Sequence, residues 1–144
     1  LSDPREVCSK IQGKVATTLK PDQNNTKYPS IYEYGYGEPW GLRGVNCRHM
    51  FFPFIEGVNI NNQPQYDEET MKRNRELRQR QRYYERQIRK AKRSLMLAKE
   101  LGDKKAVEKY KRLVEDRQAR IREFTREHGL KRFYDRERLI LVNK

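Results

Sequence analysis

The chain has 144 residues, of which 35% are hydrophobic and 37% are charged, and its formal net charge is +13. Its mean hydropathy of -1.17 leaves little apolar material for a core, which excludes a large globular enzyme and favours one modest domain, with an elongated arm or a partner covering its surface. No run of about 18 apolar residues occurs, so no membrane span is predicted. The two cysteines, Cys8 and Cys47, are too few for a secreted disulfide scaffold. They could pair with each other, but a reduced, intracellular origin is favoured.

Charge is distributed unevenly along the chain. Residues 1–70 carry 7 basic and 9 acidic side chains, a net of -2, whereas residues 71–144 carry 26 basic and 11 acidic side chains, a net of +15. A basic half of this kind favours nucleic acid, an acidic protein surface or anionic lipid as its neighbour. The alternative is a well-solvated helical hairpin that is simply rich in arginine. The chain begins at Leu1 without an initiator methionine, which suggests a fragment of a longer protein.

The first 66 residues contain glycine, proline and asparagine scattered among short apolar runs. Residues 13–19 alternate weakly and predict a short strand. Residues 50–55 predict a second strand, which Pro53 restricts to a sheet edge or a bend. Ser30 is expected to cap a short helical turn, with Glu33 at the capping-box position. The expected result is a small irregular α/β domain over residues 1–66.

Aromatic side chains are concentrated in this first segment. They are either the core of a domain poor in aliphatic residues or, if they are exposed beside arginines, a stacking surface for bases. The composition favours the core. The residues concerned are Tyr28, Tyr32, Tyr34, Tyr36, Trp40, Phe51, Phe52 and Phe54.

Two long amphipathic helices follow. Apolar residues recur at spacings of three, four and seven from Leu77 to Ala98, which predicts a helix over about 67–101. Gly102 is expected to end it and Asp103 to cap a second helix, which should run to about Glu127 before Gly129. The very short connection predicts an antiparallel hairpin over 67–128. The fold class is therefore α+β, with a tail at 129–144 that either folds back or docks on a partner.

The first helix also carries a row of basic side chains at helical spacing. Such a ridge can follow phosphates without reading sequence, so non-specific nucleic-acid binding is predicted. The residues are Arg75, Arg78, Arg82, Arg86, Arg89, Lys90 and Arg93. No zinc-finger, RNP or helix-turn-helix pattern accompanies them.

The least ordinary segment lies between Gly41 and Gly57, where cysteine, arginine and histidine follow one another. Its motif residues are Gly44, Asn46, Cys47, Arg48, His49, Pro53 and Gly57. In an extended strand Cys47 and His49 lie on the same side. Both are good zinc ligands, but a structural site needs about four ligands in paired short spacings, and only Cys8 and His128 remain. The spacing therefore predicts neither a metal nor any other cofactor.

Catalysis by this segment is weakly supported. A cysteine nucleophile needs a base within hydrogen-bond reach, and same-side neighbours on a strand usually point in parallel. Cys47 and His49 are therefore only weak catalytic candidates. The structural alternative is a tight turn fixed by Asn46 and Arg48, with Cys47 as a small buried hydrophobe. No phosphate-binding loop, Gly-x-Ser-x-Gly, His-Glu-x-x-His or acidic two-metal cluster occurs, which lowers the expectation of an enzyme.

Several blocks in order resemble a known family. They are Gln12-Gly13-Lys14-Val15, Tyr28-Pro29-Ser30, Gly35-Tyr36-Gly37, Gly44-Val45-Asn46-Cys47-Arg48-His49 and Pro53-Phe54-Ile55-Glu56-Gly57. They resemble the C-terminal part of the phage minor capsid protein 2 family, and stretches around residues 83–90, 111–113 and 132–137 are similar to the basic helical tail of that family. The Asn-Cys-Arg-His block is also distantly similar to the ending of Mu F-like head morphogenesis proteins.

The resemblance implies a minor structural component of the phage head, encoded near the portal, with no established catalytic residues. In the family a cysteine often stands at the position of Arg43, and a histidine and a tryptophan often stand at those of Cys8 and Ile11. A metal or thiol site built from those residues in relatives is incomplete or rearranged here.

Three hypotheses follow from these observations. The first is a virion structural protein, made in the host cytoplasm, that contacts portal or inner capsid proteins and lies against packaged DNA. The second is a toxin-like nuclease or other enzyme using Cys47, Arg48 and His49 with an acid such as Glu56. The third is an adaptor whose arginines meet an acidic protein surface. None involves a membrane, and an oligomer is compatible with each.

Overall fold

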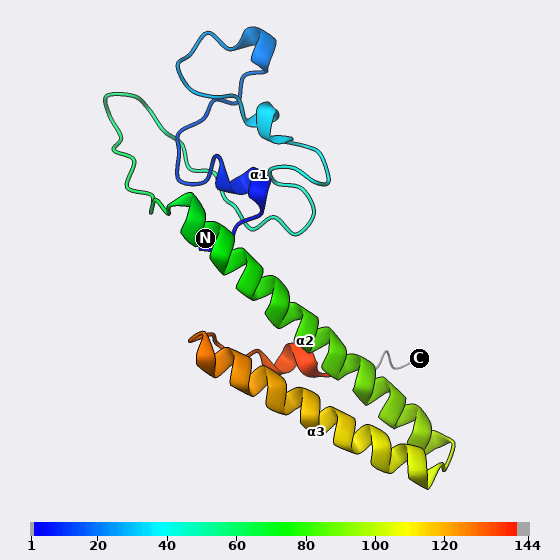
Figure 1. Ribbon diagram of the computed structural model, residues 1–144. Coiled ribbons are helices and arrows are strands. Elements are labelled where there is room, and N and C mark those ends of the chain that lie inside the picture. Colours follow the sequence, from blue (N-terminus) through cyan, green and yellow to red (C-terminus); the bar gives the residue numbers. More distant parts are fainter. Residues whose placement is uncertain (1, 141–144) are drawn as a thin grey trace. The chain divides into compact units, whose positions relative to one another are not determined.

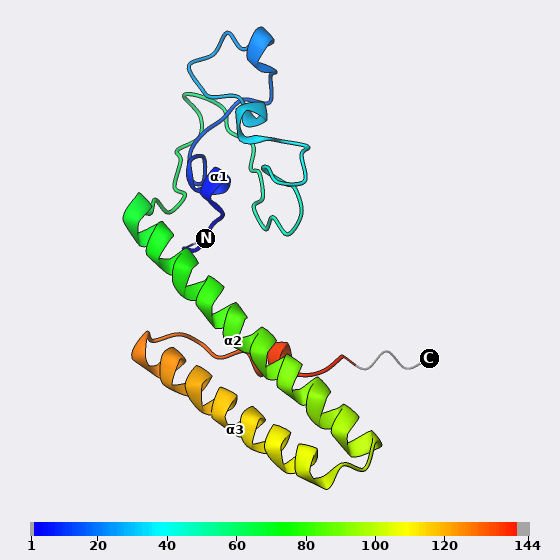
Figure 2. The ribbon, with the colours of Figure 1, turned by 45° about the vertical axis from the view of Figure 1, so that its right-hand side comes forward.

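A computed structural model describes residues 2–140 (Figures 1 and 2). Its helical elements, in chain order, are α1 (Glu6–Ser9), η1 (Pro21–Gln23), η2 (Ile31–Tyr34), α2 (Glu68–Glu100), α3 (Lys104–Glu127) and η3 (Tyr134–Glu137). The chain divides into two compact units, one ending at Arg75 and the other beginning at Glu76. Helix α2 contributes to both. Within the described part, no helix is long and apolar enough to cross a membrane.

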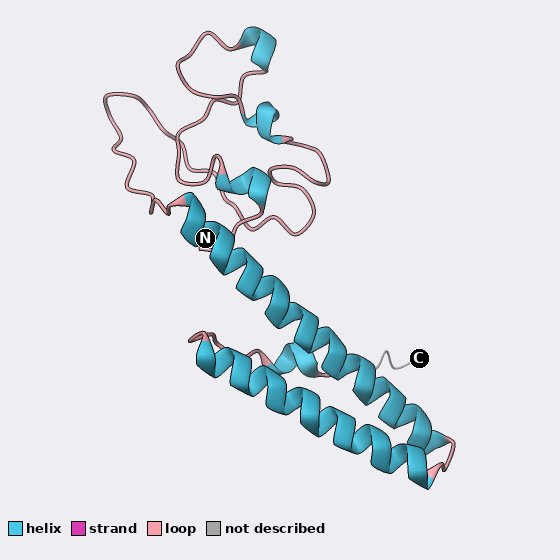
Figure 3. Cartoon of the chain, in the orientation of Figure 1, coloured by secondary structure: helices cyan, strands magenta, loops and turns pink. Residues whose placement is uncertain are grey.

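Unit 1 consists of loops and short helical turns, without a strand among residues 2–75 (Figure 3). The only pairing of strand type in this range is an isolated parallel bridge between Thr17 and Ser30. It is held by hydrogen bonds from Thr17 N to Pro29 O (2.9 Å) and from Ile31 N to Thr17 O (3.0 Å). The predicted α/β domain is therefore wrong. Segment 13–19 finds a partner at one position only, because loops and turns interrupt the chain on either side before a ladder can extend.

The predicted cap on the short turn is confirmed. The Ser30 side chain accepts a hydrogen bond from Tyr32 N at 3.3 Å, and η2 ends at Gly35, whose φ of 67° is left-handed. Ser30 is fully buried and also donates from its hydroxyl to Leu19 O at 2.6 Å. One serine thus joins the turn to the preceding loop.

The core of unit 1 is small and aliphatic rather than aromatic. Cys8, Ile11, Ile31 and Leu42 are buried, with Tyr34 packed partly against them. Most of the aromatic side chains expected to form the core are exposed, including Trp40 at 60% and Phe52 at 63%. Some of them contact one another at the surface instead, as the Tyr36 ring does with the rings of Tyr32 and Phe51.

Unit 2 confirms the predicted hairpin (Figure 1). Both helices end in a motif with a left-handed glycine, in which backbone N–H groups after the helix donate hydrogen bonds to carbonyls of its last turn. Gly102 N bonds to Lys99 O (3.1 Å) and Asp103 N to Ala98 O (3.1 Å). Asp103 then caps α3 by accepting from Ala106 N at 3.0 Å. Residues 101–103 alone therefore connect the two helices.

The end of α3 repeats this arrangement. Gly129 N bonds to Arg126 O (3.3 Å), Leu130 N bonds to Thr125 O (2.8 Å), and the φ of Gly129 is 60°. Ile88, Ala91 and Ala98 of α2 are buried, as are Ile121 and Phe124 of α3. The predicted apolar stripes supply this core.

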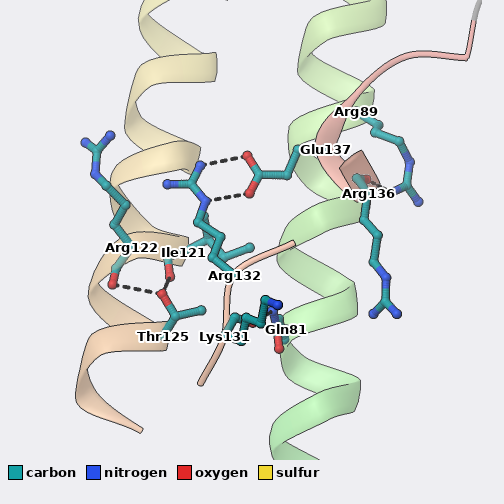
Figure 4. Close-up of polar contacts among 9 residues, drawn as sticks. All are labelled: Gln81, Arg89, Ile121, Arg122, Thr125, Lys131, Arg132, Arg136 and Glu137. Carbon is teal, nitrogen blue, oxygen red and sulfur yellow. Dashed lines mark hydrogen bonds and ion pairs between the residues drawn. The ribbon is translucent and has the colours of Figure 1, made fainter. Parts of the chain in front are cut away.

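The tail folds back within unit 2 (Figure 4). The buried Gln81 amide donates to Lys131 O at 2.9 Å, and the Arg89 guanidinium donates to Arg136 O. Glu137, 1% exposed, accepts two hydrogen bonds from Arg132 at 2.6 and 2.7 Å. Residues 141–144 of the predicted tail lie outside the described residues.

Glu85 is the one buried side chain of the described chain with an oxygen, Oε1, that lacks a hydrogen-bond partner. Burial raises its pKa, which nearby Arg136 and Arg89 only partly oppose. The folded state therefore binds more protons than the unfolded state above the ordinary pKa of a glutamate. The free energy of unfolding consequently falls as the pH rises through the window between the ordinary and the raised pKa.

We expect Glu85→Gln to raise the thermal midpoint of unit 2 at pH 7 by a few degrees, since about 1 kcal/mol corresponds to several degrees in a domain of this size. The gain should shrink toward about pH 4, where the wild-type carboxyl is also protonated. Circular dichroism at both pH values measures this effect. Glu76→Gln, on an exposed acid of the same helix, is the control, and equal midpoints for wild type and Glu85→Gln at pH 7 would contradict the expectation.

Candidate functional site

The segment 41–49 forms two successive tight turns. Gly44 N bonds to Gly41 O at 3.1 Å and Cys47 N bonds to Gly44 O at 3.0 Å. The third residue of each turn is left-handed, with φ of 61° at Arg43 and 59° at Asn46. Turns with a left-handed third position favour glycine or asparagine there, which explains Asn46. At the other turn the left-handed conformation of Arg43 is stabilised by its guanidinium, which donates a hydrogen bond to His49 O at 2.9 Å.

These turns bring together three potential ligand atoms. The sulfur atoms of Cys8 and Cys47 and a ring nitrogen of His49 all lie within 4.8 Å of one another. Cys47 Sγ is 3.4 Å from His49 Nδ1. His49 Nε2 is 2.7 Å from Gln12 Oε1. Cys8 comes from α1, 39 positions before Cys47.

Gln12 fixes which ring nitrogen of His49 carries the proton. Its Nε2 lies 3.9 Å from Met71 Sδ, as a donor toward sulfur, which leaves Oε1 facing the histidine. An amide oxygen can only accept, so His49 Nε2 donates and Nδ1 presents its lone pair to Cys47. Burial lowers the pKa of His49, and the positive charges of Arg48 and Arg5 lower it further. The ring is therefore neutral near pH 7.

The two thiols differ electrostatically. Burial raises the pKa of Cys8, and the neighbouring Cys47 raises it further. At Cys47 burial acts in the same direction but is outweighed by hydrogen-bond donors, chiefly the backbone amides of His49 and Arg43 with the side chains of Cys8 and Arg5, so its pKa is lowered. Arg5 also donates to Gly41 O at 2.7 Å, which ties α1 to the first turn.

This geometry differs from that expected for a strand. Because residues 45–46 form a turn rather than extended backbone, the side chains of Cys47 and His49 approach each other instead of pointing in parallel. Cys47 is half-buried, not fully buried. The arrangement can do two things chemically: share a proton between a thiol and an imidazole, or hold a cation between two sulfurs and a nitrogen.

The remaining motif residues lie outside this cluster. Arg48 is exposed and its guanidinium is 3.7 Å from an Asp3 carboxylate oxygen. Pro53 and Gly57 are exposed, and Gly57 is left-handed with φ of 79°. Glu56, the acid proposed for an enzyme, pairs with Lys27 at the surface.

The basic ridge of α2 is only partly available. Arg78 donates to Gln81 Oε1 at 2.8 Å and lies over the Phe133 ring, and Arg89 bonds to the tail. Arg82, Arg86, Lys90 and Arg93 are exposed, and none of them takes part in an ion pair within residues 2–140. They follow one another at spacings of four, four and three, which places them on one helix face. Arg75, half-buried, belongs to unit 1.

Sequence reasoning did not place Arg5, Cys8 or Gln12 beside the Cys47–His49 pair. Cys8 was recognised only as a remaining cysteine, because nothing in its spacing indicates which distant segment it meets. Gln12 stands in a block that resembles a known family, but that resemblance does not indicate what the side chain does. Arg5 carries no signal at all.

Comparison with known proteins relates the chain to phage structural proteins. Residues 2–126 match the family model described as "Phage minor capsid protein 2". A structural protein of Lactococcus phage mv4 is 46% identical over 116 residues, covering 80% of this chain and 94% of that protein. A structural protein of Lactococcus phage LL-H is 44% identical over 136 residues, 92% of this chain. The chain spans only 37% of the length of that relative.

No solved structure matches the chain. The family match extends through both units, from α1 to the last turn of α3. It includes every residue of the Cys8–Cys47–His49 cluster and of the exposed ridge. The chain belongs to the phage minor capsid protein 2 family.

Proposed function

We propose that this chain is a structural part of the phage head that contacts portal or inner capsid proteins through unit 1 and packaged DNA through the exposed ridge of α2. Family membership supports the structural role in the virion. The names of the two phage relatives, both structural proteins, agree with it.

The observation that carries the DNA contact is the ridge itself. Arg82, Arg86, Lys90 and Arg93 project from one face without acidic partners in the described chain. Unpaired cations on a helix release counterions when they meet phosphates, which gives affinity without sequence preference. A protein enclosed with densely packed DNA benefits from such a surface because it lowers electrostatic repulsion.

Unit 1 supports the protein contact. Its segment 40–60 exposes large apolar side chains that no other part of unit 1 covers, which is typical of surfaces that meet a protein partner. The most exposed of them are Trp40, Val45, Met50, Phe52, Ile55, Val58 and Ile60. Unit 1 has the composition of a contact domain, while unit 2 has that of a polyanion-binding arm.

The test is binding of the chain to a labelled DNA duplex across a salt series. We expect affinity that falls steeply with salt and does not depend on sequence. Changing Arg82, Arg86 and Arg93 together to glutamine should reduce the salt slope by about 2 to 3, since each lost phosphate contact removes about 0.9.

The matched control removes the same charge from α3, by changing the exposed Arg120, Arg122 and Arg126 to glutamine. It should reduce the slope less than the α2 variant. Equal effects of the two triple variants would overturn the assignment to α2. Absence of binding even at low salt would overturn the DNA contact and leave an acidic protein surface as the neighbour of the basic half.

A further inference from the structure

Unit 1 has a very small hydrophobic core. Its core cluster comprises four buried residues, Cys8, Ile11, Ile31 and Leu42, and the unit lacks a sheet or a long helix over residues 2–67. Small units with so little buried apolar surface usually depend on disulfides or a metal. The place where such a crosslink would act is where α1 meets the double turn at 41–49.

We propose that Cys8, Cys47 and His49 bind a zinc ion that joins α1 to the double turn, with water in the open fourth position. The proposal concerns unit 1 and is independent of DNA binding by α2.

The distances suit this ion. Zinc bonds to sulfur at about 2.3 Å and to imidazole nitrogen at about 2.0–2.1 Å, so tetrahedral ligands lie about 3.6 Å apart for a sulfur and a nitrogen, and about 3.8 Å apart for two sulfurs. The Cys47 Sγ to His49 Nδ1 distance is 3.4 Å, and no pair in the cluster exceeds 4.8 Å. Side-chain adjustments of about 1 Å therefore complete the three-ligand geometry, without movement of the backbone.

The surroundings of the ligands also suit a metal. Metal-binding histidines almost always donate their second ring N–H to an oxygen, which fixes the tautomer. His49 Nε2 has this relation to Gln12 Oε1, at 2.7 Å. Cys47 Sγ lies 3.4 Å from His49 Nδ1, the ring nitrogen that carries the lone pair, so both atoms face the position of the ion. Two thiolates and a neutral imidazole balance the charge of a divalent cation, and soft sulfur ligands select zinc over calcium or magnesium.

A cysteine nucleophile is the competing use of the same atoms. It does not account for Cys8, a second thiol within 4.8 Å whose side chain is buried. The half-exposed Cys47 and His49 leave one side of the cluster open to solvent, which is where the fourth ligand of zinc would stand.

The experiment uses the whole chain, purified under reducing conditions, stripped with a chelator and titrated with zinc in competition with a chromogenic chelator. We expect one zinc per chain. Cobalt substituted for zinc should give a thiolate-to-cobalt charge-transfer band and visible bands of tetrahedral intensity. Cys8→Ser, Cys47→Ser and His49→Asn should each weaken zinc binding by more than about 100-fold, and Gln12→Ala by about 10-fold or more.

His128→Asn is the matched control, because His128 is the only other histidine and lies in unit 2 against the Phe124 ring. It should bind zinc like the wild type. Fluorescence of Trp40, the only tryptophan, reports on unit 1, and zinc should raise its unfolding midpoint in the wild type but not in Cys47→Ser.

Two outcomes would overturn the proposal. One is zinc uptake by the reduced wild type no tighter than uptake by the Cys8→Ser, Cys47→Ser double variant. The other is a cobalt spectrum without a sulfur band. If the serine variants fail to fold, the wild type alone decides, through the cobalt spectrum and the effect of zinc on the Trp40 midpoint.

Discussion

Glu137→Ala is expected to lower the free energy of unfolding of unit 2 by about 3 to 5 kcal/mol. The carboxylate is 1% exposed and accepts both hydrogen bonds of the Arg132 fork, at 2.6 and 2.7 Å. These bonds raise the pKa of Arg132, even though burial opposes its charge. Removing the carboxylate leaves the Arg132 guanidinium, which is 10% exposed, without a counter-charge. Most of the cost is the free energy of keeping this charge out of water with nothing to balance it.

Chemical denaturation followed by circular dichroism measures this effect, because α2 and α3 dominate the helical signal. Asp135→Ala is the control. Asp135 pairs with Arg138 at 3.3 Å on the surface, with side chains 89% and 73% exposed, and such pairs contribute about 0 to 1 kcal/mol. A cost for Glu137→Ala no larger than that of the control would show that the buried pair does not anchor the tail.

A second variant separates the pair from its surroundings. Replacing Arg132 by methionine and Glu137 by leucine removes both charges while keeping apolar volume. Buried ion pairs exchanged in this way are often neutral or stabilising. We therefore expect the double variant to be far closer to the wild type than Glu137→Ala is.

The hairpin was predictable because its signals are local. Apolar spacing, Gly102, Asp103 and Gly129 each act within one or two turns of their own helix, and the structure reproduces the predicted ends within one residue. The sequence does not predict whether the tail returns to the hairpin. The contacts that hold it, such as that between Gln81 and Lys131, join residues 50 positions apart and carry no periodic signal.

The structure of unit 1 was not predictable because it depends on contacts between residues far apart in the sequence. Alternation over residues 13–19 indicates a strand only if a second strand pairs with it, and the chain supplies a partner at one position. Composition predicts an aromatic core, but the buried cluster consists of Cys8, Ile11, Ile31 and Leu42. The Asn-Cys-Arg-His block is visible in the sequence, but the proximity of Cys47 and His49 to Cys8 depends on how loops close over 39 positions.

Loop closure in unit 1 depends on two backbones in direct contact. Gly41 N bonds to Glu38 O at 3.0 Å, and the chain at Gly41 passes directly against Gly35. A Cβ built on Gly41 would overlap the Gly35 carbonyl and lie 2.6 Å from Gly35 Cα. Because these atoms are backbone, no rotamer change can relieve the overlap.

Gly41→Ala is therefore expected to destabilise unit 1 by about 3 kcal/mol or more, because the added methyl group has no space and the backbone must move. The consequence should reach the cluster, since Gly41 O accepts from Arg5 at 2.7 Å and begins the double turn that carries Cys47. Trp40 fluorescence during denaturation measures the loss. Circular dichroism of the helices of unit 2 should change little.

Gly37→Ala provides the matched control. Gly37 lies in the same loop with φ of 93°, but a Cβ there meets nothing within 4 Å. Its cost should be limited to the strain of a left-handed alanine, about 1 to 2 kcal/mol. If Gly41→Ala were no worse than Gly37→Ala, the contact between Gly35 and Gly41 would not be what closes the loop. If Gly41→Ala alone also abolished zinc uptake, the folding of the double turn and the assembly of the Cys8–Cys47–His49 cluster would be one event, because both depend on the same backbone contact.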